Sequence, residues 1–581
     1  MELTDKIRIL ETLVKIPTYS VAGFTHGRIV YVSNVEGELS LWSISPVEKK
    51  PLRLTKEPIH GLARPDPRSK YVVFTRDVTK GMELQKPFIV SVEGGGEELL
   101  ADTPPMRFFG MVWDGEKLVF SAASATGMGL YLARKGSYEK LMDIDTIMYP
   151  TDMDGDLVVG AGLLHKNPKS SELFFYNLST GEYKVYTPKK GSVNKQPMIQ
   201  GGRVLFESNY EGSNKLYVYD ISEDRLYRPE FKYKDYQEYG PTEHLVYDWL
   251  DDGGIWVVAK KNGRTKAFIN GKMIASPPGT LGYLALNGSK AYYSASSLTS
   301  PPKIYEVDLE RNDYQVLLDN PVPKEVEEKL GKAYFTTYKS TDGLEVPMYV
   351  VEAGTGKPGP TIVYVHGGPW SEVYDSWNIL INGLVVSGYH VLAPNFRGST
   401  GYGEEFRLMD IGDPGGGDLE DVASAAKWAK EKGLASRIAV MGYSYGGYMT
   451  YLALGRKPEL WDAGVAGAGI VDWVEMYGLS DALFKKFIET LFNGYNEELM
   501  RERSPITYVD NVRAPLCIIH PQNDTRTPLK PVLKYIEKLL ERKVTFEAHI
   551  IPDMGHMVKT VDDIVKILLP AILFLDKYLK K

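Results

Sequence analysis

The chain has 581 residues, several times the commonest domain size, so we expect at least two domains and exclude a single small binding module. Hydrophobic residues make up 43% of it and charged residues 25%, proportions that permit large buried cores and exclude a disordered protein. The net charge is −7 and no basic run stands out, so we expect no nucleic-acid partner. The one cysteine, Cys517, excludes an intramolecular disulfide, which fits either a reducing cytosol or folding that does not depend on disulfides. We expect a cytoplasmic protein.

Residues 1–16 predict an amphipathic helix rather than a signal peptide. Charged residues are mixed there with apolar residues at helical spacing, namely Leu3, Ile7, Leu10 and Val14. Near the C-terminus, the apolar stretch at residues 564–575 contains Lys566 and Pro570 and is too short for a membrane span. We therefore expect no membrane partner.

Residues 21–323 contain a repeated β-rich pattern. Seven units open with a β-rich run, spaced on average by about 44 residues, the period of a propeller blade with four short strands. A closed ring of blades leaves only short strand edges, so we predict an all-β seven-bladed propeller. Two stacked β-sandwich domains are the alternative, because the spacing is irregular and no Trp-Asp signature marks the blades. The runs begin at Arg28, Tyr71, Lys117, Asp156, Arg203, Gly254 and Lys290.

Residues 324–581 have a different texture, in which apolar strands alternate with helical patterns. Helices are predicted over 418–432 and 529–540. This alternation is typical of an α/β domain with a mainly parallel sheet that helices cover on both faces. The predicted strands begin at Thr361, His390, Ile438, Ala463, Leu516 and Phe546.

One segment of this second domain predicts a catalytic serine. The apolar strand that begins at Ile438 runs into Gly442-Tyr-Ser-Tyr-Gly446, and a helical pattern starts directly after it. A serine between a strand and a helix, flanked by glycines, is the context of a nucleophile elbow. We therefore predict Ser444 as the nucleophile of an α/β-hydrolase. A glycine-rich turn with an incidental serine is the alternative interpretation.

A serine nucleophile needs a histidine base, which in this fold follows the serine and the acid in chain order. Three histidines lie beyond Ser444. His520 precedes the best acid candidate, and His549 lies within a strand. His556 follows the end of that strand, where the catalytic edge of such a sheet lies. His556 is therefore the predicted base.

The acid that orients the histidine is predicted at Asp524, which follows the apolar strand that begins at Leu516. Asp472 lies close behind the preceding strand, and Asp553 is only three residues from His556. Either of these two fits a structural loop aspartate better.

The oxyanion of the transition state needs donors, and the loop His366-Gly-Gly-Pro-Trp370 follows the strand that begins at Thr361. That position matches the oxyanion loop of an α/β-hydrolase. We predict that the amides of Gly368, or its neighbour, and of Tyr445 form the oxyanion hole.

These segments together resemble the prolyl oligopeptidase family of serine peptidases, and within it the archaeal acylaminoacyl peptidases. The resemblance covers the whole length. It implies a propeller, an α/β-hydrolase domain and an N-terminal helix, here residues 1–20, that packs on the hydrolase. The motifs are His366-Gly-Gly-Pro, Asn395-Phe-Arg-Gly-Ser-Thr-Gly-Tyr-Gly, Gly442-Tyr-Ser-Tyr-Gly-Gly-Tyr, Ser504-Pro, Gln522-Asn-Asp and Gly555-His.

The implied reaction is release of an N-acylated amino acid from short blocked peptides through an acyl-enzyme, without a cofactor and with esterase side activity. A carboxylesterase, an aminopeptidase or oligopeptidase of the same fold, and a propeller scaffold with an inactive hydrolase are the alternatives. Tyr443 and Tyr445 stand where prolyl oligopeptidases proper usually have an asparagine beside the nucleophile. Glu97-Glu98 fits a solvated hairpin rather than the glutamate pair that dipeptidyl peptidases use for a free amino terminus. Whether the chain forms a homo-oligomer stays open.

A substrate pocket is predicted from aromatic and apolar residues that follow the strand next to the nucleophile, although aromatic residues at helical spacing more often belong to the core. They are Trp370, Trp473, Phe484, Phe487 and Ile488. Arg397 and Arg526 could bind a substrate carbonyl or carboxylate, or form structural ion pairs. No metal site is expected: Asp152-Met-Asp-Gly-Asp156 lacks the later glutamate of a calcium loop, and Asp418 fits a helix N-cap.

Overall fold

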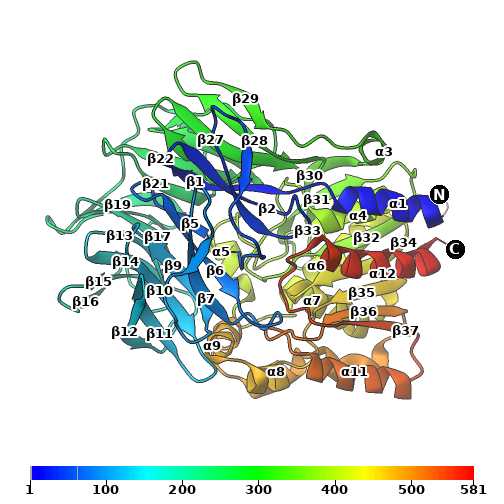
Figure 1. Ribbon diagram of the computed structural model, residues 1–581. Helices are drawn as coiled ribbons and strands as arrows, with labels where there is room; N and C mark the ends of the chain where they lie inside the picture. Colours follow the sequence, from blue (N-terminus) through cyan, green and yellow to red (C-terminus); the bar gives the residue numbers. More distant parts are fainter. Residues whose placement is uncertain (1–2, 62, 581) are drawn as a thin grey trace.

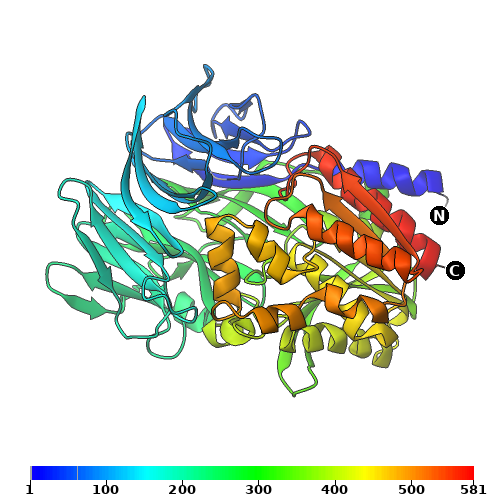
Figure 2. The same cartoon turned by 90° about the horizontal axis from the view of Figure 1, so that it is seen from below.

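The computed structural model describes residues 3–61 and 63–580, which form a β-propeller and an α/β-hydrolase domain. The propeller lies on the left in Figure 1 and the hydrolase domain on the right, with both ends of the chain at the far end of the hydrolase domain. Figure 2 shows the same division from below. The predicted fold class is confirmed.

The propeller consists of seven separate antiparallel sheets, each made from consecutive strands. The first four blades are β1–β4 (Tyr19–Thr25, Arg28–Ser33, Ser40–Ile44, Pro51–Arg53), β5–β8 (Ala63–Pro65, Tyr71–Asp77, Gln85–Ser91, Glu97–Leu99), β9–β12 (Arg107–Trp113, Leu118–Ala123, Met128–Arg134, Ser137–Ile144) and β13–β16 (Met148–Asp154, Leu157–Gly162, Glu172–Asn177, Tyr183–Tyr186).

The remaining blades are β17–β20 (Asn194–Gln200, Arg203–Ser208, Lys215–Asp220, Arg225–Tyr227), β21–β24 (Glu243–Trp249, Ile255–Lys261, Arg264–Ile269, Lys272–Met273) and β25–β29 (Thr280–Leu281, Ala285–Asn287, Lys290–Ser297, Ser300–Asp308, Asp313–Leu318). A short helix, α2 (Asp235–Tyr239), connects the fifth blade to the sixth. Apolar packing joins the last blade to the first: Tyr19 and Ile29 share a cluster with Tyr292 and Ile304. Side chains rather than an exchanged strand therefore close the ring.

Six of the seven β-rich runs found in the sequence are the second strands of their blades. The seventh, which begins at Lys290, is β27, the third strand of the last blade along the chain but the second in the pairing order of its sheet. β10 and β22, for example, are buried along almost their whole length because neighbouring blades cover both of their faces. The first strand of a blade is either short, as in β5, or contains both buried and partly exposed residues, as in β17. A continuous apolar run therefore marks the middle of a blade rather than its beginning.

The hydrolase domain is built on one sheet of eight strands in the order β30-β31-β33-β32-β34-β35-β36-β37. The last six positions in this order are parallel, and β30 and β31, which the sequence analysis did not predict, pair antiparallel at one edge. The strands are β30 (Lys332–Lys339), β31 (Glu345–Glu352), β32 (Gly359–Val365), β33 (His390–Pro394), β34 (Ala435–Tyr443), β35 (Ala463–Gly467), β36 (Leu516–Pro521) and β37 (Phe546–Ile551).

Helices cover both faces of this sheet, because alternate strand residues such as Ile362 and Val363 belong to opposite apolar cores. One core contains α1 (Leu3–Val14), α4 (Ile379–Val386) and α12 (Val561–Leu579), so the N-terminal helix packs on the hydrolase domain as expected (Figure 1). The other helices are α3 (Lys324–Glu327), α5 (Glu404–Arg407), α6 (Gly417–Glu431), α7 (Tyr445–Arg456), α8 (Trp473–Leu479), α9 (Ala482–Leu491), α10 (Glu497–Glu502) and α11 (Leu529–Glu541), with 3-10 turns η1 (Leu408–Asp410), η2 (Pro458–Leu460) and η3 (Pro505–Asn511).

The observed elements refine the predicted domain limits. The first propeller strand begins at Tyr19, two residues before the predicted start, and the last ends at Leu318. The sheet of the hydrolase domain begins at Lys332, with α3 between the two. Over residues 3–61 and 63–580, no helix combines the length and apolar character that crossing a membrane requires.

Candidate active site

Ser444 lies on a sharp turn between β34 and α7. Its backbone has φ 61° and ψ −120°, a conformation that non-glycine residues rarely adopt. The turn is tight enough that a Cβ on Gly446 would lie 2.0 Å from the carbonyl oxygen of Val365. Only glycine fits there, and the strained serine is held at the end of the strand with its side chain exposed to the cavity described below.

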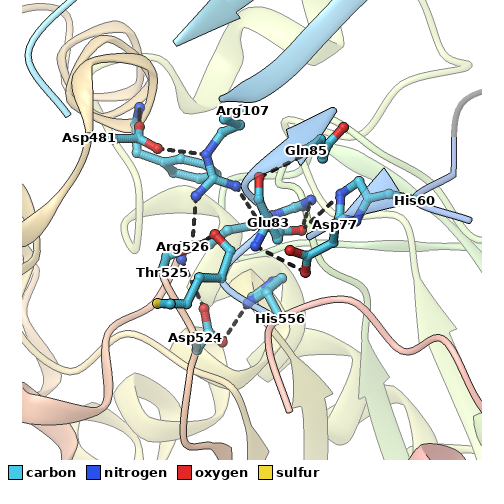
Figure 3. A network of polar contacts seen from close by, with 12 residues as sticks. His60, Asp77, Glu83, Gln85, Arg107, Asp481, Asp524, Thr525, Arg526 and His556 are labelled. Carbon is cyan, nitrogen blue, oxygen red and sulfur yellow. Dashed lines mark hydrogen bonds and ion pairs between the residues drawn. The ribbon is translucent and has the colours of Figure 1, made fainter. Parts of the chain in front are cut away.

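The structure brings the three predicted triad residues together. His556 Nε2 lies 2.9 Å from Ser444 Oγ, and His556 Nδ1 lies 2.7 Å from Asp524 Oδ2. These side chains reach one another because β34, β36 and β37 are parallel, so the loops after them meet at one edge of the sheet. Figure 3 shows the contact between Asp524 and His556.

Hydrogen bonds hold Asp524 in its ionised form. Its Oδ1 accepts from the amides of Arg526 at 2.9 Å and Thr527 at 2.8 Å, and its Oδ2 also accepts from Thr527 Oγ1 at 2.8 Å. Burial alone would raise the pKa of Asp524, but His556 and these donors outweigh it and lower the pKa. The carboxylate can therefore orient the imidazole and stabilise its charged form.

The rival histidines and carboxylates have other roles. His520 Nε2 lies 2.7 Å from the carbonyl oxygen of Thr527, and His549 lies on the edge strand β37. Asp472 caps α8 by accepting from two amides at 3.0 Å. Asp553 has a side chain 68% exposed. None of these four contributes a hydrogen bond to the triad among the interactions of the described residues.

A cavity of about 210 Å³ opens at the nucleophile. Gly368 and Tyr445 both line it next to Ser444, so the two residues predicted to supply the oxyanion hole lie on its wall. Three lining residues escaped the sequence analysis: Ile470, Met476 and Thr527. The remaining wall consists of Trp473, Phe484, Phe487 and Arg526, as predicted. A larger cavity, of about 930 Å³, is lined by residues such as Glu352 and Lys580 and contains no triad residue.

Three predicted pocket residues lie elsewhere. Arg397 is bound to Asp342 Oδ2 at 2.8 Å and Asp421 Oδ1 at 2.7 Å, so it forms a structural ion-pair network and does not face the cavity. Ile488 is 1% exposed and packs in the core of the domain. Trp370 does not line the cavity but packs edge-on against Phe487, with ring centres 5.5 Å apart.

Asp418 differs from its predicted role as a helix N-cap. The N-cap position of α6 is Gly416, and Asp418 lies inside the first turn with its side chain fully buried. Its carboxylate accepts a hydrogen bond from the hydroxyl of Tyr445.

A second group that the sequence analysis missed is Glu83, from the propeller loop between β6 and β7 (Figure 3). Its carboxylate accepts from Arg526 Nε and Nη2, each at 2.7 Å, and from the guanidinium of Arg107. Arg107 in turn donates to Asp481 Oδ2 at 2.6 Å. Arg526 is thus a member of an ion-pair network between the two domains as well as part of the pocket wall.

The Glu83 loop lies directly on the catalytic histidine loop. A Cβ on Gly81 would lie 2.3 Å from the amide nitrogen of Gly555, and Asn523 Nδ2 donates to the carbonyl oxygen of Lys80 at 2.7 Å. The second blade therefore covers the triad from the propeller side. Nothing in the local sequence around Glu83 marks this contact, which only the packing of the two domains creates.

We expect Glu83→Gln to lower the free energy of unfolding by about 3 kcal/mol, because it removes one partner of a buried ion pair, leaves Arg526 without its carboxylate and leaves Arg107 with Asp481 alone. The side chains of Glu83 and Arg107 are 1% and 6% exposed. Chemical denaturation of both proteins measures the difference. Glu98→Gln is the matched control, since Glu98 pairs with Lys135 at an exposed site that contributes little. Equal denaturation midpoints for the Glu83 and Glu98 variants would contradict the expectation.

The carboxylate of Glu83 also predicts that the folded protein loses stability at acid pH. Burial would raise the pKa of Glu83, but Arg526 and Arg107 hold it at about 2. A folded pKa below the unfolded value gives stability that is full above about pH 5 and is lost as the pH falls from about 4.5 towards 2. We expect Glu83→Gln to lessen this acid sensitivity. Denaturation midpoints of the two proteins, measured from pH 6 to pH 3, should converge as the pH falls.

Known protein families match segments of both domains. Residues 30–305 match the family described as "Acylamino-acid-releasing enzyme-like, N-terminal domain", and residues 376–581 match the prolyl oligopeptidase family. Acylamino-acid-releasing enzyme of Mus musculus is 33% identical over 35% of this chain and 29% of its own length. Dipeptidyl aminopeptidase BIII of Pseudoxanthomonas mexicana is 30% identical over 34% of this chain and 30% of its own length. The match thus spans less than a third of each relative.

Solved structures cover nearly the whole chain. Acylaminoacyl peptidase of Pyrococcus horikoshii has a TM-score of 0.74 at 20% identity and covers 98% of this chain and 97% of its own. A puromycin-hydrolysing peptidase of Mycobacterium tuberculosis has a TM-score of 0.82 at 16% identity, over 98% and 96% of the two chains. These likenesses establish the fold. For the hydrolase domain, the family that matches, over residues 376–581, is the prolyl oligopeptidase family.

Proposed function

We propose that this chain is a serine peptidase that releases an N-acylated amino acid from short blocked peptides. The observation that carries this proposal is the pairing of Glu83. It is the acidic side chain that the propeller inserts beside the pocket, and two arginines already neutralise it. Glu97 and Glu98 pair with Arg76 and Lys135 instead. A substrate with a free ammonium group would gain no carboxylate partner from these residues, whereas an acylated one needs none.

The proposed reaction is acyl transfer through Ser444. Ser444 Oγ attacks the scissile carbonyl while His556 Nε2 takes its proton, and Asp524 stabilises the imidazolium that forms. The amides of Gly368 and Tyr445 stabilise the oxyanion. His556 then gives the proton to the leaving amine, and the C–N bond breaks. Water, activated by the same histidine, hydrolyses the acyl-enzyme and releases the N-acylated amino acid.

The pocket favours a large apolar side chain on the scissile residue. Three aromatic side chains, Trp473, Phe484 and Phe487, surround a volume of about 210 Å³. Apolar walls with few polar groups are typical of sites that select by shape and apolar contact. We therefore propose acylated phenylalanine or leucine as preferred residues. Activated esters of apolar acids should react as a side activity. Ser444 attacks an ester in the same way as an amide, and the leaving group of an activated ester is a weaker base than that of an amide.

The propeller is proposed to limit the substrate to short or unfolded chains, because its second blade covers the triad. We also propose a cytoplasmic location, since Cys517 is free and buried and the residues supply no disulfide. If a purified preparation degraded a folded protein as fast as an acylated tripeptide, the proposed gating by the propeller would be wrong.

One assay separates the proposed function from its rivals in the same fold. Turnover is measured on acetyl-phenylalanine anilide, unblocked phenylalanine anilide and a medium-chain ester. We expect kcat/KM for the acetylated anilide to be at least about tenfold higher than for the unblocked anilide. A preference for the unblocked anilide would favour an aminopeptidase, and turnover of the ester alone would favour a carboxylesterase. Labelling of the protein by a fluorophosphonate would exclude an inactive scaffold.

Phe487→Ala tests the pocket. Loss of an aromatic wall removes about 1–3 kcal/mol of discrimination, so kcat/KM for acetyl-phenylalanine anilide should fall by about 10- to 100-fold. The value for acetyl-alanine anilide should change by less than about threefold, because a methyl group does not reach that wall. An equal loss on both substrates would mean that Phe487 supports the fold rather than the preference.

A further inference from the structure

Asp418 lies behind the oxyanion hole. It is in the first turn of α6, has a fully buried side chain, and accepts from the hydroxyl of Tyr445 at 2.5 Å. Tyr445 is the first residue of α7, directly after the nucleophile, and its ring packs against Phe396 and Tyr448. The hydroxyl of the residue that supplies one oxyanion amide is therefore tied to a fixed acceptor.

Asp410 makes the equivalent contact with the opposite side of the hole. It ends the turn η1, is 1% exposed, and accepts from Trp370 Nε1 through Oδ1 at 3.2 Å. Trp370 comes two residues after Gly368 in the loop that supplies the other amide. The short segment from Asp410 to Asp418 therefore ties both walls of the oxyanion hole.

Burying these two carboxyl groups is costly. Burial raises the pKa of Asp418 to about 7 and raises that of Asp410 well above its usual value, to which the charge of Asp418 adds. No salt bridge to Asp418 occurs among the described residues, although Arg407 is close enough to act weakly on Asp410. Neither carboxyl group has a salt bridge among the described residues, so burying them contributes little to stability and their position next to the hole calls for another role.

The backbone at the hole supplies that role. Ser444 has φ 61°, and a strained residue keeps its conformation only where surrounding contacts over-determine it. Gly368 has φ +126°, a conformation that glycine adopts freely, so contacts around it must hold the loop in place. The anchored hydroxyl is on Tyr445 itself, whose amide is one donor, and the anchored indole of Trp370 is two residues after Gly368. Both contacts restrain the rotation of these amides. Donors of an oxyanion hole act at about 2.7–3.1 Å from the position of the developing oxyanion, so a displacement of a few tenths of an ångström weakens them.

We propose that Asp418 and Asp410 are positioning residues, which hold the amides of Tyr445 and the Gly368 loop at the geometry that stabilises the oxyanion. The inference rests on the proposed acyl transfer through Ser444, but not on which acylated substrate the enzyme uses. Asp418 acts through the Tyr445 hydroxyl, and Asp410 acts through the Trp370 indole.

The test uses Tyr445→Phe, Asp418→Ala and the double variant. Each single change should lower kcat by about tenfold or more on both acetyl-phenylalanine anilide and a p-nitrophenyl ester, with KM changed less than about twofold, because the hydrogen bond acts on the transition state. The double variant should lose no more than either single one, since all three remove the same bond. Asp418→Asn keeps an acceptor oxygen and should recover most of the loss. Trp370→Phe tests the Asp410 side in the same way.

Tyr451→Phe is the matched control. Tyr451 lies on the same helix α7, is fully buried, and has a hydroxyl without a hydrogen-bond partner among the described residues. Its variant should keep the parental kcat. Thermal midpoints of all variants separate misfolding from positioning, because a folded variant with a tenfold lower kcat supports the proposal.

Three results would overturn the inference. They are a kcat for Tyr445→Phe within twofold of the parent, losses that multiply in the double variant, and losses that follow only the folded fraction. If the acetylated anilide is not a substrate, the p-nitrophenyl ester still gives the same ratios. Failure of the proposed peptidase function is thereby distinguished from failure of the positioning role.

Discussion

Ser444→Ala is expected to lower turnover by about 10⁶-fold, on anilide and ester alike, because the acyl-enzyme cannot form without a nucleophile. The geometry gives this substitution a narrow effect. The substitution removes the contact between Ser444 Oγ and His556 Nε2. Alanine can adopt the backbone conformation at φ 61° with the same strain as serine. Activity should therefore fall while folding is retained.

The measurement combines turnover with labelling. A fluorophosphonate should label the parent protein stoichiometrically and the Ser444→Ala variant not at all. The thermal midpoint should change by less than a few degrees, which identifies the loss as chemical. Turnover above about 1% of the parent value, or labelling of the variant, would show that Ser444 is not the nucleophile. The residual rate over water should stay measurable, because the oxyanion hole and the pocket remain.

The triad could be predicted because each member follows a strand of the parallel sheet. The carboxyl ends of such strands meet at one edge, so strand order and chain order together select Ser444, Asp524 and His556. Rejecting His549 needed only its place inside β37. Local sequence patterns were sufficient wherever the geometry depended on a strand and the loop directly after it.

The pocket was predicted less completely, because helical spacing defines a face but not which part of it meets a cavity. On α9, Phe484 and Phe487 face the cavity, whereas Ile488 turns into the core beside Leu491. Arg397 looked equally suited to a substrate and to an ion pair, and Asp421, 24 residues further along, decided for the ion pair. Such choices depend on packing between elements that no local pattern encodes.

The role of Glu83 could not be predicted from the sequence. This residue comes from a propeller loop, 443 residues before its partner Arg526, and the contact arises only when the two domains dock. The hydroxyl of Tyr445 illustrates the same limit at shorter range, since its acceptor Asp418 had the local signature of a helix cap. Contacts between distant elements bring Glu83 to Arg526 and Asp418 to Tyr445, although neither acidic residue lies in a recognisable motif.

Asp524→Asn should lower kcat by about 10⁴-fold at neutral pH while leaving the fold intact. Oδ1 of residue 524 accepts from the amides of Arg526 and Thr527, so an asparagine must place its carbonyl oxygen there. Its NH₂ group then takes the place of Oδ2 and faces His556 Nδ1. The imidazole must accept at Nδ1 and carry its proton on Nε2, which cannot take a proton from Ser444.

The neighbouring threonine makes this a test of catalysis rather than stability. Thr527 Oγ1 now contacts both Asp524 Oδ2, at 2.8 Å, and the carbonyl oxygen of Ala468, at 2.9 Å. In the variant the new NH₂ group can donate to Thr527 Oγ1, which keeps its own bond to Ala468. We expect a thermal midpoint close to the parental one together with the loss of kcat. Asp553→Asn, on an exposed loop three residues before His556, should keep full activity; a comparable loss there would make Asp553 the orienting acid.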